Sequence, residues 1–175
     1  MVEVTIDSIR VSLMSQHRVV ILKDIDSNRY LPIWIGPCEA DAITVRLQEV
    51  EVARPLTHDL LCNAIAQFGA KVTEVQISEL RDDVFYARII LRLTTGKTME
   101  VDARPSDAIA VAVRTQVKVF VADPVMKQAA VTPEEELEKE GAEEHDERLS
   151  VFKDFVDSLD LDGLGGDDDE PPEKQ

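Results

Sequence analysis

Several stretches of the chain alternate between apolar and polar residues with a period of two, and each predicts a β-strand. Residues 2–13, "VEVTIDSIRVSL", alternate but lose phase at Asp7 and Ser8, which predicts a strand with a bulge or bend. Residues 18–24, "RVVILKD", are apolar without interruption in their middle, which is typical of a central strand. A return strand over residues 29–36 completes a predicted β-hairpin.

A second set of strands follows and repeats this plan. Residues 71–80 and 84–93 predict two strands, and "TTGK" supplies the turn to a third strand over residues 98–104. Residues 117–123, "VKVFVAD", predict a short buried strand. The alternation predicts inward-facing side chains at Phe85, Ala87, Ile89, Leu91, Leu93, Met99, Val101 and Ala103.

Other segments carry apolar residues at the 3.6-residue period of an amphipathic helix. Residues 37–50 and the helical segment that opens at Pro105 both begin with proline, which suits the first helical position because no amide hydrogen is needed there. Residues 54–69 predict a helix with Thr57 as N-cap and Gly69 at its end, and "PVMKQAA" predicts a short last helix. The predicted apolar faces are Ala40, Ile43, Leu47 and Val50; Leu60, Leu61, Ala64, Ile65 and Phe68; and Ile109, Ala112 and Val113.

Two of these helices belong to an internal repeat. The segment "IGPCEADAITVR" (35–46) aligns with "ARPSDAIAVAVR" (103–114), so that Pro37 matches Pro105, which lies 68 positions later. Each half of the chain is a β-hairpin unit followed by helices. The sequence therefore predicts an α+β fold in which the duplicated units form one compact domain with a mixed β-sheet over residues 1–130.

The charge of the chain is unevenly distributed. The net charge of the 175 residues is −16, but residues 1–123 hold 17 acidic against 14 basic side chains, whereas residues 124–175 hold 18 against 5. The near-neutral body has no basic stripe with interleaved aromatics, which argues against tight sequence-specific DNA binding. The acidic excess predicts a tail that repels polyanions and gates access to the body, or one that only keeps the protein in solution.

The tail over residues 131–175 is expected to be partly helical and then disordered. Thr132, Pro133 and Glu135 resemble the start of a capping box, and a modest apolar stripe precedes Gly163. The members of that stripe are Leu149, Phe152, Val156 and Leu159.

Cysteine usage and hydropathy indicate a cellular compartment. Cys38 and Cys62 form no CxxC pair and lie in helical patterns, so we expect two buried free thiols in a reducing environment. Met1 is followed by a strand pattern and not by a basic segment with an apolar core, and no apolar run is long enough to span a membrane. We expect a cytoplasmic protein without a membrane partner.

No Walker loop, HExxH, GxSxG, zinc-ligand spacing or glycine-rich dinucleotide turn is present. The candidate chemistry lies instead at three predicted helix N-termini, "GPCEAD", "RPLTHDL" and "ARPSDA", where free amides and the helix dipole favour an anion such as phosphate. Ser106, Asp107 and Glu39 occupy the first turns of the two repeated helices. They either bind phosphate, act as a base or hold a divalent cation, or they only stabilise the helix start by about 0.3–1 kcal/mol.

The third of these N-termini carries Arg54, Thr57, His58 and Asp59. A histidine titrates near neutrality and suits proton transfer in phosphodiester cleavage, although a solvated first-turn residue is an equal alternative. Arg54 and Arg104 each precede a proline, where a guanidinium could bind phosphate or form a surface ion pair. The single tryptophan, Trp34, lies between two isoleucines and is expected in the core rather than as a stacking platform for bases.

The segments "RYLPIWIGPCEADAI", "RPLTHDLL" and "VDARPSDAIAVAVR", in this order, resemble the bifunctional nuclease domain family over residues 1–130. The resemblance implies a compact, internally duplicated α+β domain, a homodimer, and cleavage of both DNA and RNA. The polar residues at its motif positions are Glu39, Arg54, Thr57, His58, Asp59, Arg104, Ser106 and Asp107.

The leading hypothesis is a nuclease that cleaves DNA and RNA with low sequence specificity. Arg54, Thr57, Arg104 and Ser106 would bind the substrate, and His58 would be the general acid or base. Asp59, Asp107 or Glu39 would orient the histidine or hold a divalent cation such as Mg²⁺, which the carboxylates permit but do not require. The alternatives are a non-catalytic ligand-binding or regulatory homodimer, and turns that only organise a dimer interface.

Overall fold

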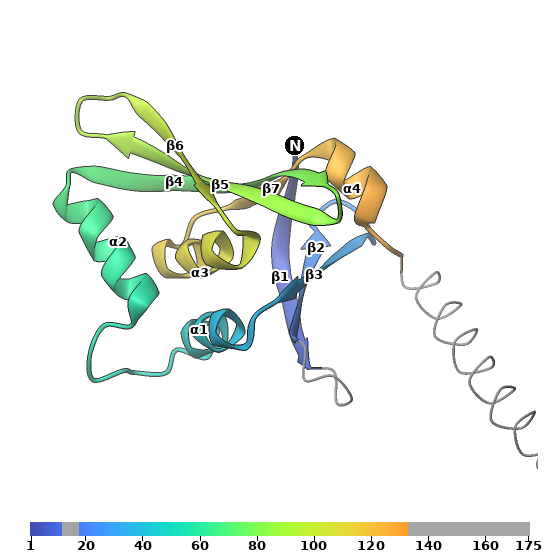
Figure 1. Cartoon of the computed structure of the whole chain (residues 1–175), viewed down its shortest axis with the longest axis horizontal. Coiled ribbons are helices and arrows are strands. Elements are labelled where there is room, and N and C mark those ends of the chain that lie inside the picture. Colours follow the sequence, from blue (N-terminus) through green and yellow to red (C-terminus); the bar gives the residue numbers. More distant parts are fainter. Residues whose placement is uncertain (12–17, 133–175) are drawn as a thin grey trace, which may run out of the picture. The chain divides into compact units, whose positions relative to one another are not determined.

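The computed structural model describes residues 1–11 and 18–132 (Figure 1). Within them, seven strands form one mixed sheet in the order β3-β2-β1-β7-β4-β5-β6, so the α+β prediction is confirmed. The strands are β1 (Val2–Val11), β2 (Arg18–Asp24), β3 (Tyr30–Ile35), β4 (Ala70–Arg81), β5 (Val84–Leu93), β6 (Thr98–Ala103) and β7 (Val119–Val121). The helices are α1 (Pro37–Leu47), α2 (Thr57–Gln67), α3 (Pro105–Thr115) and α4 (Asp123–Ala129).

The repeat seen in the sequence is also a repeat of structure. The bounds of β3 and α1 recur in β6 and α3 exactly 68 residues later. The counterpart of β7 in the first repeat would be residues 51–53, which form no strand. Strand β7 pairs antiparallel with β1 and parallel with β4, and it thereby joins the two three-stranded units into one sheet.

Helix α3 is the centre of the helical layer. It contacts α1, α2, β4 and β5, and Figure 1 shows α1, α2 and α3 grouped on one side of the β4–β5 strands. All five residues from Ala108 to Ala112 are buried, because alternating alanine and larger apolar side chains let neighbouring elements approach closely. The first turn of α3 is thus held against the first turns of its neighbours.

Details of the hairpins agree with the pattern of the sequence. The register of β1 against β2 shifts between Ile6 and Ser8, where the sequence predicts a bulge or bend. Gly96 takes a φ of +83° in the turn before β6, and Gly69 takes +73° directly after α2. Both values lie in the left-handed region that favours glycine, and Gly69 ends α2 as predicted.

Several predicted core positions are wrong, since they lie on edge strands or helix ends. Trp34 is 66% exposed because β3 is an edge strand. Met99 and Val101 are exposed on β6, which is the opposite edge strand. On the neighbouring strand β5, the predicted inward-facing residues Ala87, Ile89 and Leu91 are buried. In α1, Ala40 and Ile43 are buried but Leu47 is exposed, and Val50, which lies beyond the end of α1, is exposed as well.

Helix α2 and the cysteines also differ from expectation. The N-cap of α2 is Leu56 and not Thr57, because the carboxylate of Asp59 accepts the Leu56 amide. Leu60, Leu61 and Phe68 are exposed, whereas Cys62 and Ile65 pack against the core. Both cysteines are free, as predicted, but Cys38 is exposed and Cys62 only half-buried.

The tail predictions for residues 133–175, including the proposed helix start at Glu135 and the apolar stripe, lie outside the described residues. In the described part, no helix combines the length and apolar character needed to cross a membrane.

Candidate active site

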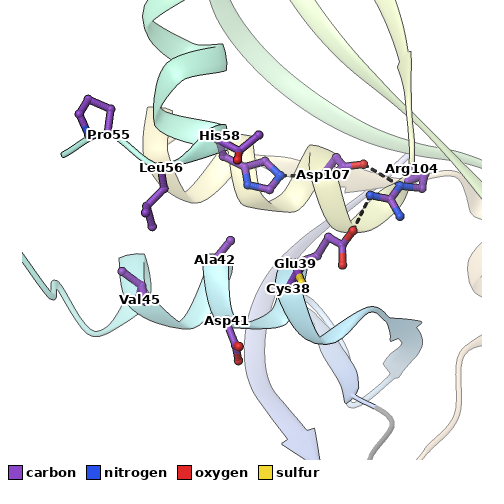
Figure 2. Close-up of a pocket in the computed structure, with 11 residues that line it drawn as sticks. Cys38, Glu39, Asp41, Ala42, Val45, Pro55, Leu56, His58, Arg104 and Asp107 are labelled. Carbon is purple, nitrogen blue, oxygen red and sulfur yellow. Dashed lines mark hydrogen bonds and ion pairs between the residues drawn. The ribbon is translucent and has the colours of Figure 1, made fainter. Parts of the chain in front are cut away.

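A pocket of about 640 Å³ opens between the first turns of three helices (Figure 2). One face of α1 forms one wall, and the segment entering α2 forms another. The first turn of α3 closes the end with Arg104 and Asp107. The full lining is Cys38, Glu39, Asp41, Ala42, Val45, Pro55, Leu56, Thr57, His58, Arg104 and Asp107.

The three helix N-termini that the sequence singles out therefore meet at one pocket. Gly36 and Arg104 precede α1 and α3 in extended conformation, and neither helix start has a side-chain cap among the described residues. The amides in the first turns of α1 and α3, to which the two prolines contribute none, therefore have no side-chain cap among the described residues. Each N-terminus also contributes about +0.5 of an elementary charge.

A chain of polar contacts crosses the pocket from α2 to α3 to α1. His58 Nε2 lies 3.1 Å from Asp107 Oδ1, and Arg104 Nε donates to Asp107 Oδ2 at 2.8 Å. Arg104 Nη2 donates to Glu39 Oε1 at 2.5 Å. Figure 2 shows these side chains pointing toward one another, with Asp107 between His58 and Arg104. Residues 49 and 65 positions apart in the sequence are thus joined.

The protonation of this chain follows from its contacts. Burial by itself would raise the pKa of Asp107, but hydrogen bonds from Arg104 and His58 and the positive charge of Arg104 outweigh it and hold the pKa below its ordinary value. An ionised carboxylate only accepts hydrogen bonds, so His58 Nε2 carries the hydrogen. In neutral His58 the lone pair is therefore on Nδ1, which can accept a proton.

The sequence model of the bifunctional nuclease domain matches residues 20–134. The chain belongs to this family. It is 39% identical to an uncharacterized protein of Mycobacterium tuberculosis over 90% of this chain and 94% of that protein. It is also 29% identical to Bifunctional nuclease 1 of Oryza sativa subsp. japonica and 27% identical to Bifunctional nuclease 2 of Arabidopsis thaliana. Each plant match covers 60% of this chain but only 33% of the plant protein.

One glycine of the bifunctional nuclease domain permits the contact between Glu39 and Arg104. A Cβ atom placed on Gly36 would lie 2.3 Å from Glu39 Oε2, because the Glu39 side chain folds back over Gly36 toward α3. Gly36 is the repeat counterpart of Arg104. The first repeat therefore leaves space where the second repeat supplies a guanidinium.

A second ion pair fixes the start of α2 behind the pocket. Arg114 Nε donates to Asp59 Oδ1 at 2.7 Å, and Asp59 Oδ2 accepts the Leu56 amide at 2.8 Å. Arg114 Nη1 also donates to the carbonyl oxygens of Ala42 and Ala110. Burial would raise the pKa of Asp59, but the Leu56 amide and Arg114 lower it overall. Asp59 therefore positions the helix turn that carries His58.

The other predicted site residues occupy different positions. Thr57 lines the pocket, and Asp107 rather than Asp59 contacts His58. Ser106 is only 6% exposed and is not among the pocket-lining residues. Arg54 is exposed and also lies outside the lining. The sequence analysis did not identify Arg114 as a site residue, because Arg114 aligns with Arg46 and so looks like an ordinary position of the repeat.

Metal ligation and pocket charge set limits on the chemistry. In residues 1–11 and 18–132, no group of three His, Cys, Asp or Glu side chains is close enough to hold a metal ion. Glu39, Asp107 and Arg104 together carry a formal charge of −1, while Asp41 pairs with Arg18 at 3.7 Å. Three helix dipoles of about +0.5 each offset this charge, so an anion is not repelled.

Proposed function

We propose that this protein is a nuclease that hydrolyses phosphodiester bonds of DNA and RNA with low sequence specificity. The observation that carries the proposal is the hydrogen-bonded series His58–Asp107–Arg104 at a pocket formed by three helix N-termini. Membership of the bifunctional nuclease domain family supports the same class of reaction.

Arg104 and the helix amides would hold the scissile phosphate. A guanidinium has five N–H donors in a planar fork, and the contacts to Glu39 and Asp107 leave donors of Arg104 available. Its side chain is 65% exposed toward solvent, so a phosphate oxygen can reach it. These donors neutralise the charge that develops on the phosphoryl oxygens in the transition state.

His58 would act as the general base. Its Nδ1 takes a proton from a water molecule while the water oxygen forms a bond to phosphorus. The bond between phosphorus and the leaving oxygen breaks with its electron pair, and the leaving oxygen takes up a proton from solvent. Asp107 holds the imidazole in the tautomer that this step requires and stabilises the imidazolium that results.

Low specificity follows from the kind of contact available. The donors proposed to hold phosphate are a guanidinium, backbone amides and the Thr57 hydroxyl, which bind phosphate in any sequence and carry no base readout. The wall made by Ala42 and Val45 offers apolar contact without directional hydrogen bonds.

The test compares two isosteric substitutions at carboxylates of α3 and β6. Asp107→Asn removes the acceptor that fixes the His58 tautomer and should lower the cleavage rate by about 100-fold or more. Asp102→Asn makes the same chemical change at an exposed position outside the pocket and should leave the rate unchanged. Equal rates in both variants would reject the proposed role, and assays with and without EDTA report the metal requirement separately.

A non-catalytic ligand-binding or regulatory role is the second candidate. It is favoured by the engagement of Arg104 with two carboxylates. Saturable binding of a small phosphorylated ligand without turnover across a series of divalent ions would support it.

We also infer a cytoplasmic homodimer. Several apolar side chains of the α1–α2 connection and of α2 are exposed, which supports an interface with a second copy of the chain. They include Val50, Val52, Leu56 and Leu60. Sedimentation of the wild type and of Leu60→Glu tests this inference. We expect the wild type to be a dimer and the added glutamate of Leu60→Glu to dissociate it, and a monomeric wild type would contradict the inference.

A further inference from the structure

A second pocket of about 640 Å³ lies at the opposite end of α2. It is bounded by the last turn of α2, the first residues of β4, the end of β5 and Val117 after α3. Helix α2 therefore begins at the candidate active site with His58 and ends at this second pocket with Ala66 and Gly69. Its 11 residues separate the two ends by about 16 Å.

Two cations lie side by side in the second pocket. Lys71 on β4 is directly opposite Arg92 on β5, and both side chains line the pocket. Like charges directly opposite one another in an antiparallel pair are destabilising. No acidic side chain of residues 1–11 and 18–132 forms an ion pair with either one. Residues 1–123 hold 17 acidic and 14 basic side chains, so a pair of cations without an acidic partner in the described residues points to an anionic ligand.

The remaining chemistry of the pocket fits a nucleotide. Thr94 lines it beside the cations and supplies a hydroxyl group, whereas the Thr73 hydroxyl donates to the Ile90 carbonyl oxygen at 3.1 Å. Phe68 is not among the lining residues, but it directly precedes Gly69 and is 86% exposed, at the turn between α2 and β4. Proteins that bind single-stranded nucleic acid combine cations for the backbone with aromatic rings on which bases stack.

We propose that Lys71 and Arg92 form a second phosphate-binding site for single-stranded nucleic acid, with Phe68 stacking on a base. A strand that occupies both this site and the His58 pocket must span at least the length of α2. A stacked strand advances about 3.4 Å per phosphate, so the length of α2 corresponds to about five nucleotides. That one strand occupies both sites rests on the proposed nuclease function, whereas the anion site depends only on its own residues.

Binding of an eight-nucleotide single-stranded DNA to the full chain tests this site, with fluorescence anisotropy as the measurement. His58→Gln serves as the background, so that the strand is not cleaved during the titration. In it, Lys71→Gln/Arg92→Gln should weaken binding about tenfold, and the slope of log affinity against log salt should fall by about 1.4, or 0.7 for each phosphate. Phe68→Ser should weaken binding with an unchanged salt slope, because stacking releases no counterions.

Arg88→Gln/Lys127→Gln is the matched control. It removes one arginine and one lysine outside both pockets, so it changes the net charge equally and should bind like the background variant. Equal weakening in both double variants would overturn the proposal, because only overall charge would then matter. Unchanged affinity in Lys71→Gln/Arg92→Gln would overturn it as well.

Inorganic phosphate, titrated by calorimetry, separates a small anion from a strand. If Lys71→Gln/Arg92→Gln lost phosphate binding but kept its oligonucleotide affinity, the site would serve a small phosphate compound and the proposal would be wrong. Cleavage by the wild type is measured separately. If the wild type does not cleave but binding still depends on Lys71 and Arg92, only the nuclease proposal is rejected. If the wild type cleaves but binding does not depend on Lys71 and Arg92, only this site is rejected.

Discussion

The ion pair between Arg114 and Asp59 should be one of the most costly polar contacts to remove. Arg114 is 5% exposed and Asp59 27% exposed, and their atoms are 2.7 Å apart. Arg114→Leu leaves a largely buried carboxylate without its cation and removes donors from Ala42 and Ala110. Breaking a buried pair from one side costs about 3–5 kcal/mol; because Asp59 keeps partial contact with water, we expect about 3 kcal/mol.

Urea unfolding followed by circular dichroism measures this cost, and an exposed pair provides the control. Arg88 and Glu100 are 3.0 Å apart with about half of each side chain exposed, so Arg88→Leu should cost less than about 1 kcal/mol. A double-mutant cycle of Arg114→Leu with Asp59→Asn should be non-additive. If Arg114→Leu cost no more than Arg88→Leu, or if the cycle were additive, the structural role assigned to the pair would be refuted.

The same pair predicts a pH dependence. Because the pKa of Asp59 is lowered in the folded state, its contribution is complete above the ordinary aspartate value of about 3.9 and is lost as pH falls through the lower folded pKa. The stability difference between the wild type and Arg114→Leu should therefore shrink below about pH 4. A difference that stayed constant down to pH 2 would contradict this assignment.

Three further predictions concern the pocket and the tail. Gly36→Ala should displace the Glu39 side chain and raise KM. The free energy of unfolding should stay within about 0.5 kcal/mol, because the backbone conformation of Gly36 suits alanine. An unchanged KM would argue against the Glu39 contact. Maleimide should label exposed Cys38 quickly and block substrate, whereas burial raises the pKa of Cys62 and slows its reaction; mass spectrometry identifies the labelled thiol. Truncation after Pro133, which removes most of the acidic excess, should strengthen nucleic-acid binding at low salt, and an unchanged affinity would leave the tail without a gating role.

Local patterns in the sequence were sufficient for the repeated elements. The prolines at Pro37 and Pro105 mark the first residues of α1 and α3, and the phase change near Ser8 marks the register shift of β1 against β2. These features depend on residues close together in the chain. Burial was harder to predict, because the exposure of Trp34 and Met99 depends on which strands form the edges of the sheet.

The site required contacts across the fold. The helix starts were recognisable as candidates, but the sequence left open which carboxylate would contact His58. The choice of Asp107 depends on how α2 packs against α3, and the bond from Arg104 to Glu39 depends on the packing of α1 against α3. Lys71 and Arg92 became neighbours only through the register of β4 against β5.

The central claim is that His58 takes the proton from the attacking water. The most direct test measures cleavage of labelled single- and double-stranded DNA and RNA by wild type and His58→Gln, purified identically. The account predicts that the wild type cleaves both nucleic acids and that His58→Gln is slower by about 100- to 10,000-fold while folding normally. Equal cleavage by the two proteins, or none by the wild type, would contradict it.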